Sequence, residues 1–128
     1  MRILLDTHIL CWSLSEPEKL NSIVREILDD NDNELWVSDI SFFELSIKMN
    51  IGKFTYQGGL QELLNDFSKM KIETLQMNSW HLLTYVQLPP HHKDPFDRLL
   101  IAQAKAEGMK MVTNDKEFKK YDLEIIWN

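Results

Sequence analysis

Apolar residues along the chain follow two kinds of spacing, which alternate from one end to the other. Short runs centred on branched apolar residues are typical of buried strands. On this basis we predict strands over Arg2–Asp6, Glu34–Val37, Ile72–Leu75, Met109–Thr113 and Leu123–Trp127. Between them, apolar residues recur every three or four positions, which predicts helices. These helices cover Thr7–Leu14, Asn21–Asp29, Ile40–Asn50, Leu60–Met70, Asn78–Gln87, Pro95–Glu107 and Asp115–Lys120.

The clearest helix is Pro95–Glu107, because its apolar residues form one stripe and Gly108 stands at the position of a C-terminal cap. The Pro89-Pro90 pair predicts an extended segment before this helix. Lys53–Gly59 is expected to be a loop with a short extended piece inside it. Strands that alternate with helices imply an α/β fold, a three-layer α/β/α sandwich around a mainly parallel sheet.

The 128-residue chain is 44% hydrophobic, enough for one core, and no linker or repeat divides it. We therefore expect residues 1–128 to form one domain. No stretch approaches the ~18 apolar residues of a membrane helix, and the apolar run after Met1 is too short for a signal peptide. The single cysteine, Cys11, fits a reducing cytoplasm. A lone cysteine is a candidate nucleophile, but beside Leu10 and Trp12 we expect Cys11 to be a core residue.

With 14 Lys and Arg against 20 Asp and Glu, the net charge is −6. This balance argues against an ordinary DNA-binding module, which is usually basic with clustered Lys and Arg. It does not argue against an enzyme that gathers carboxylates at its active site. The placement of the acids therefore decides what the charge means.

Four acidic residues fall at comparable places in the alternation of strands and helices. Asp6 and Asp115 follow predicted strands directly, while Glu44 and Asp97 lie near the starts of helices. In open α/β folds, ligands bind in the crevice beyond the carboxyl ends of the strands. We therefore expect these four side chains to converge, although they are far apart in the sequence.

Each acid also has a purely structural interpretation. Asp6 and Asp115 would cap helices, because an Asp side chain accepts hydrogen bonds from the free N–H groups at a helix start. Glu44 would complete a capping box with Ser41, or pair with Lys48 one turn along the helix.

Asp94 has the strongest structural interpretation, because it precedes Pro95 in an arrangement typical of a helix cap followed by proline. If Asp94 caps the helix, Asp97 is not needed for capping and is free to face outward. We therefore favour Asp97 as the functional ligand and keep Asp94 as a secondary candidate.

Carboxylates that meet at one sheet edge repel one another unless a cation lies between them. Hard divalent cations take oxygen ligands, and Mg²⁺ is held by a few carboxylates together with waters and substrate phosphates. The pattern of acids thus predicts a Mg²⁺ or Mn²⁺ site.

Four segments around these acids form recognisable motifs. They are L-L-D-T-H from Leu4, S-F-F-E-L-S-I-K from Ser41, D-P-F-D-R-L-L-I-A-Q-A from Asp94 and V-T-N-D-K-E-F from Val112. Together they resemble the successive acidic motifs of the PIN domain, over essentially the whole chain. The third segment is the most specific of the four. Within this family the chain looks most like the VapC-type toxins of prokaryotic toxin–antitoxin pairs.

The resemblance implies a metal-dependent endoribonuclease that cleaves RNA. The metal-binding residues that it implies are Asp6, Glu44, Asp97 and Asp115. It also implies a homodimer, inhibited by a small cognate antitoxin whose C-terminal segment crosses the groove and masks the acids.

Phosphodiester hydrolysis needs an activated water and neutralisation of the developing charge, both of which carboxylate-bound divalent ions supply. We hypothesise that Asp6 and Asp97 hold the principal ion. Glu44 would orient its water or help to bind a second ion, and Asp115 would complete the shell.

Basic residues are expected to flank an acidic site that receives RNA. The candidates near the motifs are Lys48, Lys93, Arg98 and Lys116. Thr7 and Thr113 stand next to motif acids, where their hydroxyls can hydrogen-bond a metal-bound water or a phosphate oxygen. For Thr7, a role at the helix start is equally compatible with the sequence.

Parts of the sequence suggest other functions. His91 and His92 with Asp94, and His8 beside Asp6, suggest a zinc hydrolase, but adjacent residues of an extended segment point to opposite sides. A phosphoryl-switch domain is disfavoured because Asp6 stands alone after its strand. The lack of a G-x-x-x-x-G-K-[ST] motif excludes a P-loop nucleotide hydrolase. The main alternative is a catalytically inactive PIN-like module that binds RNA or protein.

Overall fold

The structure is a computed structural model that describes residues 1–91 and 94–127. Its strands are β1 (Arg2–Leu5), β2 (Glu34–Ser38), β3 (Glu73–Leu75), β4 (Lys110–Val112) and β5 (Ile125–Ile126). Its α-helices are α1 (Thr7–Ser15), α2 (Ser22–Asp29), α3 (Asp39–Asn50), α4 (Gly59–Ser68), α5 (Ser79–Tyr85) and α6 (Pro95–Glu107). Two short 3₁₀ helices are η1 (Pro17–Lys19) and η2 (Lys116–Lys120). Within the described residues, no helix has the length and apolar character needed to span a membrane.

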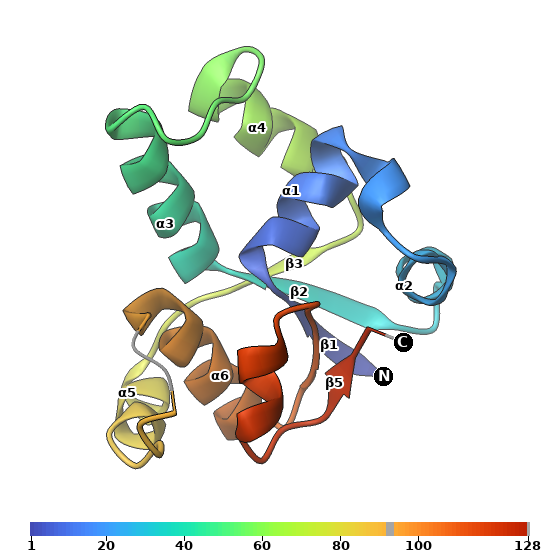
Figure 1. The fold of residues 1–128 in the computed structure, drawn as a ribbon. Coiled ribbons are helices and arrows are strands. Elements are labelled where there is room, and N and C mark those ends of the chain that lie inside the picture. Colours follow the sequence, from blue (N-terminus) through green and yellow to red (C-terminus); the bar gives the residue numbers. More distant parts are fainter. Residues whose placement is uncertain (92–93, 128) are drawn as a thin grey trace.

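The strands form one sheet in the order β3-β2-β1-β4-β5 (Figure 1). All four pairings in it are parallel, and β1 lies at the centre between β2 and β4. The direction of chain winding reverses beside β1, which is where ligands bind in doubly wound sheets. The predicted parallel sheet is confirmed.

Two apolar clusters cover the two faces of the sheet. In β1, Ile3 and Leu5 belong to one cluster and Leu4 to the other, because successive side chains of a strand point to opposite faces. The first cluster contains residues of α1, α2 and α4, and the second contains residues of α6 and η2 with Tyr85 of α5 against it. Figure 1 shows these helices as layers on either side of the sheet, so the predicted three-layer sandwich is confirmed.

Most predicted elements lie within a residue or two of the observed ones, and α6 has the predicted bounds with Gly108 in a left-handed conformation at its end. The predicted loop after α3 contains no helix or strand over residues 54–56, whereas one structural interpretation is wrong. Helix α3 begins at Asp39 and is capped by Ser38, whose Oγ accepts a hydrogen bond from the N–H of Ile40 at 3.0 Å. Glu44 therefore lies in the second turn of α3, and the capping box with Ser41 does not form.

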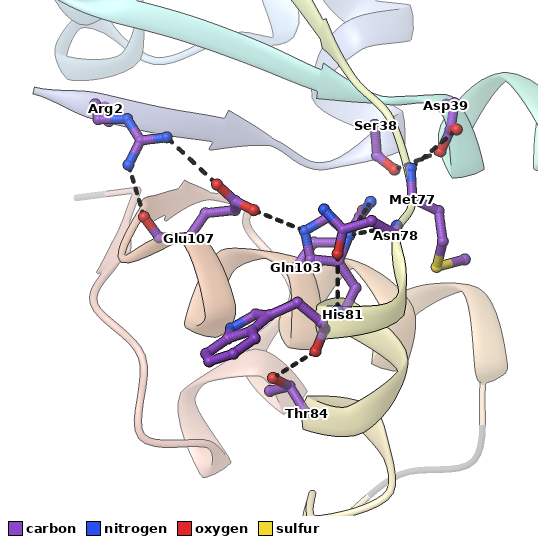
Figure 2. A network of polar contacts seen from close by, with 10 residues as sticks. Arg2, Ser38, Asp39, Met77, Asn78, His81, Thr84, Gln103 and Glu107 are labelled. Carbon is purple, nitrogen blue, oxygen red and sulfur yellow. Dashed lines mark hydrogen bonds and ion pairs between the residues drawn. The ribbon is translucent and has the colours of Figure 1, made fainter.

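A buried polar network holds α5 and α6 against the start of β1 (Figure 2). His81 is fully buried, and its Nδ1 accepts a hydrogen bond from the backbone N–H of Asn78 at 3.2 Å. The proton therefore resides on Nε2, which donates to Oε2 of Glu107 at 2.8 Å. Arg2 donates to the carbonyl oxygen of Glu107 at 2.7 Å. The network therefore holds α6, the helix that carries Asp97, against the sheet.

Candidate metal centre

A cleft of about 420 Å³ opens beyond the carboxyl edge of the sheet. The structure brings together in its lining all the acids singled out from the sequence: Asp6, Glu44, Asp94, Asp97 and Asp115. They arrive from the ends of β1 and β4 and from α3 and α6. A larger hollow of about 760 Å³ lies beside α2 and contains none of these residues. The acids predicted to bind metal therefore lie in the smaller cleft and not in the larger hollow.

Asp6 is 3% exposed and is held by hydrogen bonds on both carboxylate oxygens. Its Oδ1 accepts from the N–H of Thr7 at 2.7 Å, as predicted for a helix cap. Its Oδ2 accepts from Oγ1 of Thr113 at 2.7 Å and lies 3.0 Å from Nδ1 of His8. The Asp6 N–H donates to the carbonyl of Val112 at 3.0 Å, which continues the pairing of β1 with β4. Capping thus orients the carboxylate without removing it from the cleft.

Thr113 connects Asp6 to Asp115. It is 1% exposed, and the oxygen that donates to Asp6 also accepts from the backbone N–H of Asp115 at 3.0 Å. Asp115 in turn caps η2, because its Oδ1 accepts from the N–H of Glu117 at 2.9 Å. Thr113 does not line the cleft. The structure therefore gives Thr113 a positioning role, and its contact with a ligand stays a prediction.

Glu44 is 7% exposed and projects from α3 into the cleft. Its Oε2 pairs with Nζ of Lys48 at 3.0 Å, so the predicted pairing one helical turn apart is confirmed. Thr7 and Ser41 join α1 to α3 nearby through their hydroxyl oxygens, which lie 2.8 Å apart. The Oε1 of Glu44 is buried and has no hydrogen-bond partner in the described part of the chain. A buried oxygen of this kind is costly unless something in the cleft binds it.

Helix α6 presents two acids with different roles. Asp94 caps the helix as predicted, since its Oδ1 accepts from the N–H groups of Phe96 at 2.9 Å and of Asp97 at 3.3 Å. Asp97 sits in the first turn and faces the other carboxylates. Burial raises the pKa of Asp97 to about 8, and the negative charge of Asp6 is the next largest cause. Asp97 therefore gives up its proton less readily than an ordinary aspartate does.

These donors fit a divalent cation in its hydrated form. In residues 1–91 and 94–127, no three His, Cys, Asp or Glu side chains converge closely enough to hold an ion directly. Mg²⁺ usually keeps several waters and takes only one or two carboxylates directly. The free oxygen of Glu44 and the crowded charge of Asp97 give such an ion two places to bind.

His8, two residues after Asp6, also lines the cleft. Its Nδ1 faces Asp6, and its Nε2 lies 2.5 Å from Oδ1 of Asn114. The edge of its ring meets Trp12 at 4.9 Å between centroids. Burial lowers the pKa of His8, but the hydrogen bond and charge of Asp6 outweigh burial, so the pKa is raised overall. His8 therefore takes up a proton more readily than a free imidazole does.

Arg98 is not among the residues that line the cleft, and its contact with RNA stays a prediction. Its guanidinium donates to the carbonyl of Pro89 at 2.9 Å and to Oη of Tyr121 at 3.1 Å. It also lies 5.1 Å from the centre of the Tyr85 ring. These contacts tie α6 to the end of α5 and to η2, so the structure assigns Arg98 to the packing of that layer.

The remaining predicted cations are divided between the cleft and the outer surface. Lys48 lines the cleft, where it pairs with Glu44, while Lys116 is exposed and lies outside the lining. Lys93 falls outside the described residues. Lys53, which the sequence placed in a loop, lines the cleft as well. No motif near Lys53 indicated that it lines the cleft, because its position depends on the turn that ends α3.

Comparison with known proteins identifies the family. A profile of the PIN domain matches residues 3–124, nearly the whole chain. The chain belongs to the PIN-domain family. Ribonuclease VapC22 of Mycobacterium tuberculosis is 30% identical to it over 127 residues, which cover 93% of this chain and 91% of the relative. The resemblance to VapC-type toxins is therefore confirmed.

Solved structures agree on the fold. VapBC2 from Rickettsia felis, bound to a DNA fragment from its promoter, matches with a TM-score of 0.77 at 23% identity over 100% of both chains. DNA-bound VapBC from Salmonella typhimurium matches with a TM-score of 0.75 at 18% identity, covering 100% of this PIN-domain chain and 99% of the other. At these identities the likeness establishes the shared α/β/α architecture.

Proposed function

We propose that this PIN-domain protein is a metal-dependent endoribonuclease and the toxin of a toxin–antitoxin pair. The observation that carries the proposal is the convergence of acids from four separate elements on one cleft, where a buried oxygen of Glu44 lacks a partner. A ribonuclease relative at 30% identity supports RNA as the substrate class.

Asp6 and Asp97 would hold the principal Mg²⁺ or Mn²⁺ ion, because they face each other from β1 and α6 across the cleft. Glu44 would offer Oε1 to the same ion's water or to a second ion, and Asp115 would complete the set. When bound, the ion supplies an activated water and neutralises charge on the phosphate in the transition state.

The other residues of the cleft prepare these ligands. Thr113 and His8 fix one oxygen of Asp6, so the carboxylate does not have to be oriented when substrate arrives. Lys48 pairs with Oε2 of Glu44, while Oε1 has no partner in the described part of the chain and would be available to the ion. Such preorganisation is the main way in which a protein contributes to electrostatic catalysis.

A small cognate antitoxin is the proposed protein partner. The similar structures described above are VapBC toxin–antitoxin complexes. An acidic cleft of this kind complements a basic side chain carried on an antitoxin segment, which would mask the carboxylates. We also infer that the protein acts in the cytoplasm, where its RNA substrates and a reduced Cys11 are found.

A homodimer is the proposed assembly. Phe43 and Ile47 of α3 and its C-cap residue Ile51 are exposed at a spacing of four residues, and α5 exposes Leu82 and Leu83. Figure 1 shows α3 and α5 on the same side of the molecule. Large apolar side chains gathered on one side are typical of surfaces that pair with another protein.

The test is cleavage of total cellular RNA by the purified protein, with Mn²⁺ or with a chelator, followed by sequencing of the ends. We expect cleavage with Mn²⁺ only, and its loss in Asp97→Asn. Mn²⁺ should also raise the melting temperature of the wild type, since it binds the folded state, but not that of Asp97→Asn. Without metal, Asp97→Asn should melt at the same temperature as the wild type or a few degrees higher, because the change removes a repelled charge.

Asp122→Asn is the matched control, because Asp122 is exposed and lies outside the cleft. It should leave both cleavage and the response to Mn²⁺ unchanged. Wild-type cleavage rates in a folded Asp97→Asn protein would contradict the assigned site. Binding of RNA without any cleavage would instead favour a catalytically inactive PIN-like module.

A further inference from the structure

The chain leaves α3 through a tight turn that directs Lys53 to the cleft. Gly52 has a φ of 75°, and its N–H donates to the carbonyl of Met49 at 3.2 Å. The N–H of Lys53 donates back to the carbonyl of Lys48 at 2.8 Å. These two bonds and the left-handed glycine form a Schellman motif, which fixes the direction of the chain after a helix. The position of Lys53 is therefore built into the end of α3.

The charges in the cleft leave Lys53 available for a ligand. Lys48 is engaged with Glu44, and the acids of the lining outnumber its lysines. In the described ranges, no ion pair joins Lys53 to an acid, and its side chain is exposed. An RNA strand that enters the cleft brings its phosphates close to carboxylates, so a cation at the wall lowers the repulsion.

We propose that Lys53 binds the RNA phosphate next to the one that is cleaved, on the α3 side of the carboxylates. Phe54 and Thr55 continue the same wall, and Thr55 also borders a neighbouring hollow of about 620 Å³. That hollow is lined by the acids Glu62 and Asp66 without a Lys or Arg. The favourable phosphate position is therefore at Lys53 and not farther along the loop.

This inference rests on the proposed ribonuclease function, and its test compares Lys53→Ala with Lys53→Arg. The substrate is a labelled single-stranded RNA that the wild type cleaves, with Mn²⁺ at a fixed concentration. Lys53→Ala should lower kcat/KM about 5- to 10-fold through a higher KM, because the contact is made equally in the ground and transition states. The slope of log(kcat/KM) against log[salt] should become shallower by about 0.7, the value for one phosphate contact on a single strand. Lys53→Arg should restore both values.

The control is Lys69→Ala, since Lys69 is likewise an exposed lysine at the end of a helix but lies outside the cleft. It should behave as the wild type. The rise in melting temperature with Mn²⁺ should be the same in all four proteins, because Lys53 is not placed among the metal ligands.

An unchanged KM and salt slope in Lys53→Ala would overturn the inference while leaving the proposed function intact. A weaker Mn²⁺ response in Lys53→Ala would also overturn it, in favour of a role at the metal. If the wild type cleaves no RNA, the function and the inference fail together.

Discussion

Single residues in this PIN domain serve folding and chemistry at once. Asp6 and Asp115 each cap a helix through one oxygen and still line the cleft. A carboxylate has two oxygens and several lone pairs, so satisfying a backbone N–H leaves acceptor capacity for a cation. The structural and functional interpretations of these acids are therefore compatible.

A substitution at Thr113 tests whether this residue positions Asp6 and Asp115. Thr113→Val keeps the shape but removes the hydroxyl that donates to Asp6 and accepts from the Asp115 N–H. We expect a loss of about 1–3 kcal/mol in the free energy of unfolding, measured by urea denaturation, because the buried Asp6 oxygen and the partly buried Asp115 N–H lose their partner. RNA cleavage should fall as Asp6 loses its fixed orientation. Thr113→Ser keeps the hydroxyl and should retain both properties; equal stability of the Val variant would contradict the assignment.

Cys11 should be chemically inert, although it lines the cleft. Burial raises its pKa to about 11, and the charge of Glu44 adds to the effect. Only the thiolate is nucleophilic, so alkylation by iodoacetamide at pH 8 should be about a hundredfold slower than for an unperturbed thiol. Mass spectrometry of timed samples measures this rate, and the protein unfolded in urea supplies the reference. Labelling at equal rates in the folded and unfolded protein would contradict the prediction.

At the scale of elements, the helix starts decide which acids serve as caps. Because Asp94 caps α6, Asp97 three residues later is released toward the other carboxylates. At the start of α3, Ser38 caps instead of Ser41, so Glu44 is also free of capping. The Asp94-Pro95 pair was specific enough to predict the cap of α6. The cap of α3 could not be predicted in the same way, because it depends on where β2 ends.

The role of Asp94 can be tested through its cap. Asp94→Ala should cost about 1 kcal/mol in the free energy of unfolding, whereas Asp94→Ser should cost much less, because a serine oxygen still accepts from the helix N–H groups. Both variants should cleave RNA within a few-fold of the wild type. Thermal denaturation and cleavage assays on the same preparations check this. Loss of cleavage in a stable Asp94→Ser variant would mean that Asp94 binds the ion.

At the scale of the whole molecule, the sheet order brings the site together. The order β3-β2-β1-β4-β5 places the end of β1 beside the end of β4, so Asp6 and Asp115 become neighbours through Thr113. Helices α3 and α6 complete the cleft from either side. Two layers of helices then leave α3 and α5 with exposed apolar side chains.

The proposed homodimer should depend on that exposed surface. Leu83→Glu introduces a charge at a residue that is 63% exposed on α5, and we expect it to convert a dimer into a monomer in sedimentation velocity experiments. Leu64→Glu is the control, since Leu64 is 42% exposed on α4, which belongs to the layer of α1 and α2. A monomeric wild type, or a dimer that survives Leu83→Glu, would contradict the proposal.

The sequence by itself determined the elements, their alternation and the acids, because strand runs, helical periodicity and cap residues are local signals. The sequence also indicated the family, since the segment from Asp94 to Ala104 is specific to the PIN domain. The contacts of the polar side chains around the site depended on tertiary structure. Thr113 donates to Asp6, Arg98 packs against the Tyr85 ring, and Lys53 lines the cleft. Their surroundings come from segments distant in the sequence, or from the way a helix ends. No local pattern records those contacts, so only the packed fold decides which cation faces the carboxylates.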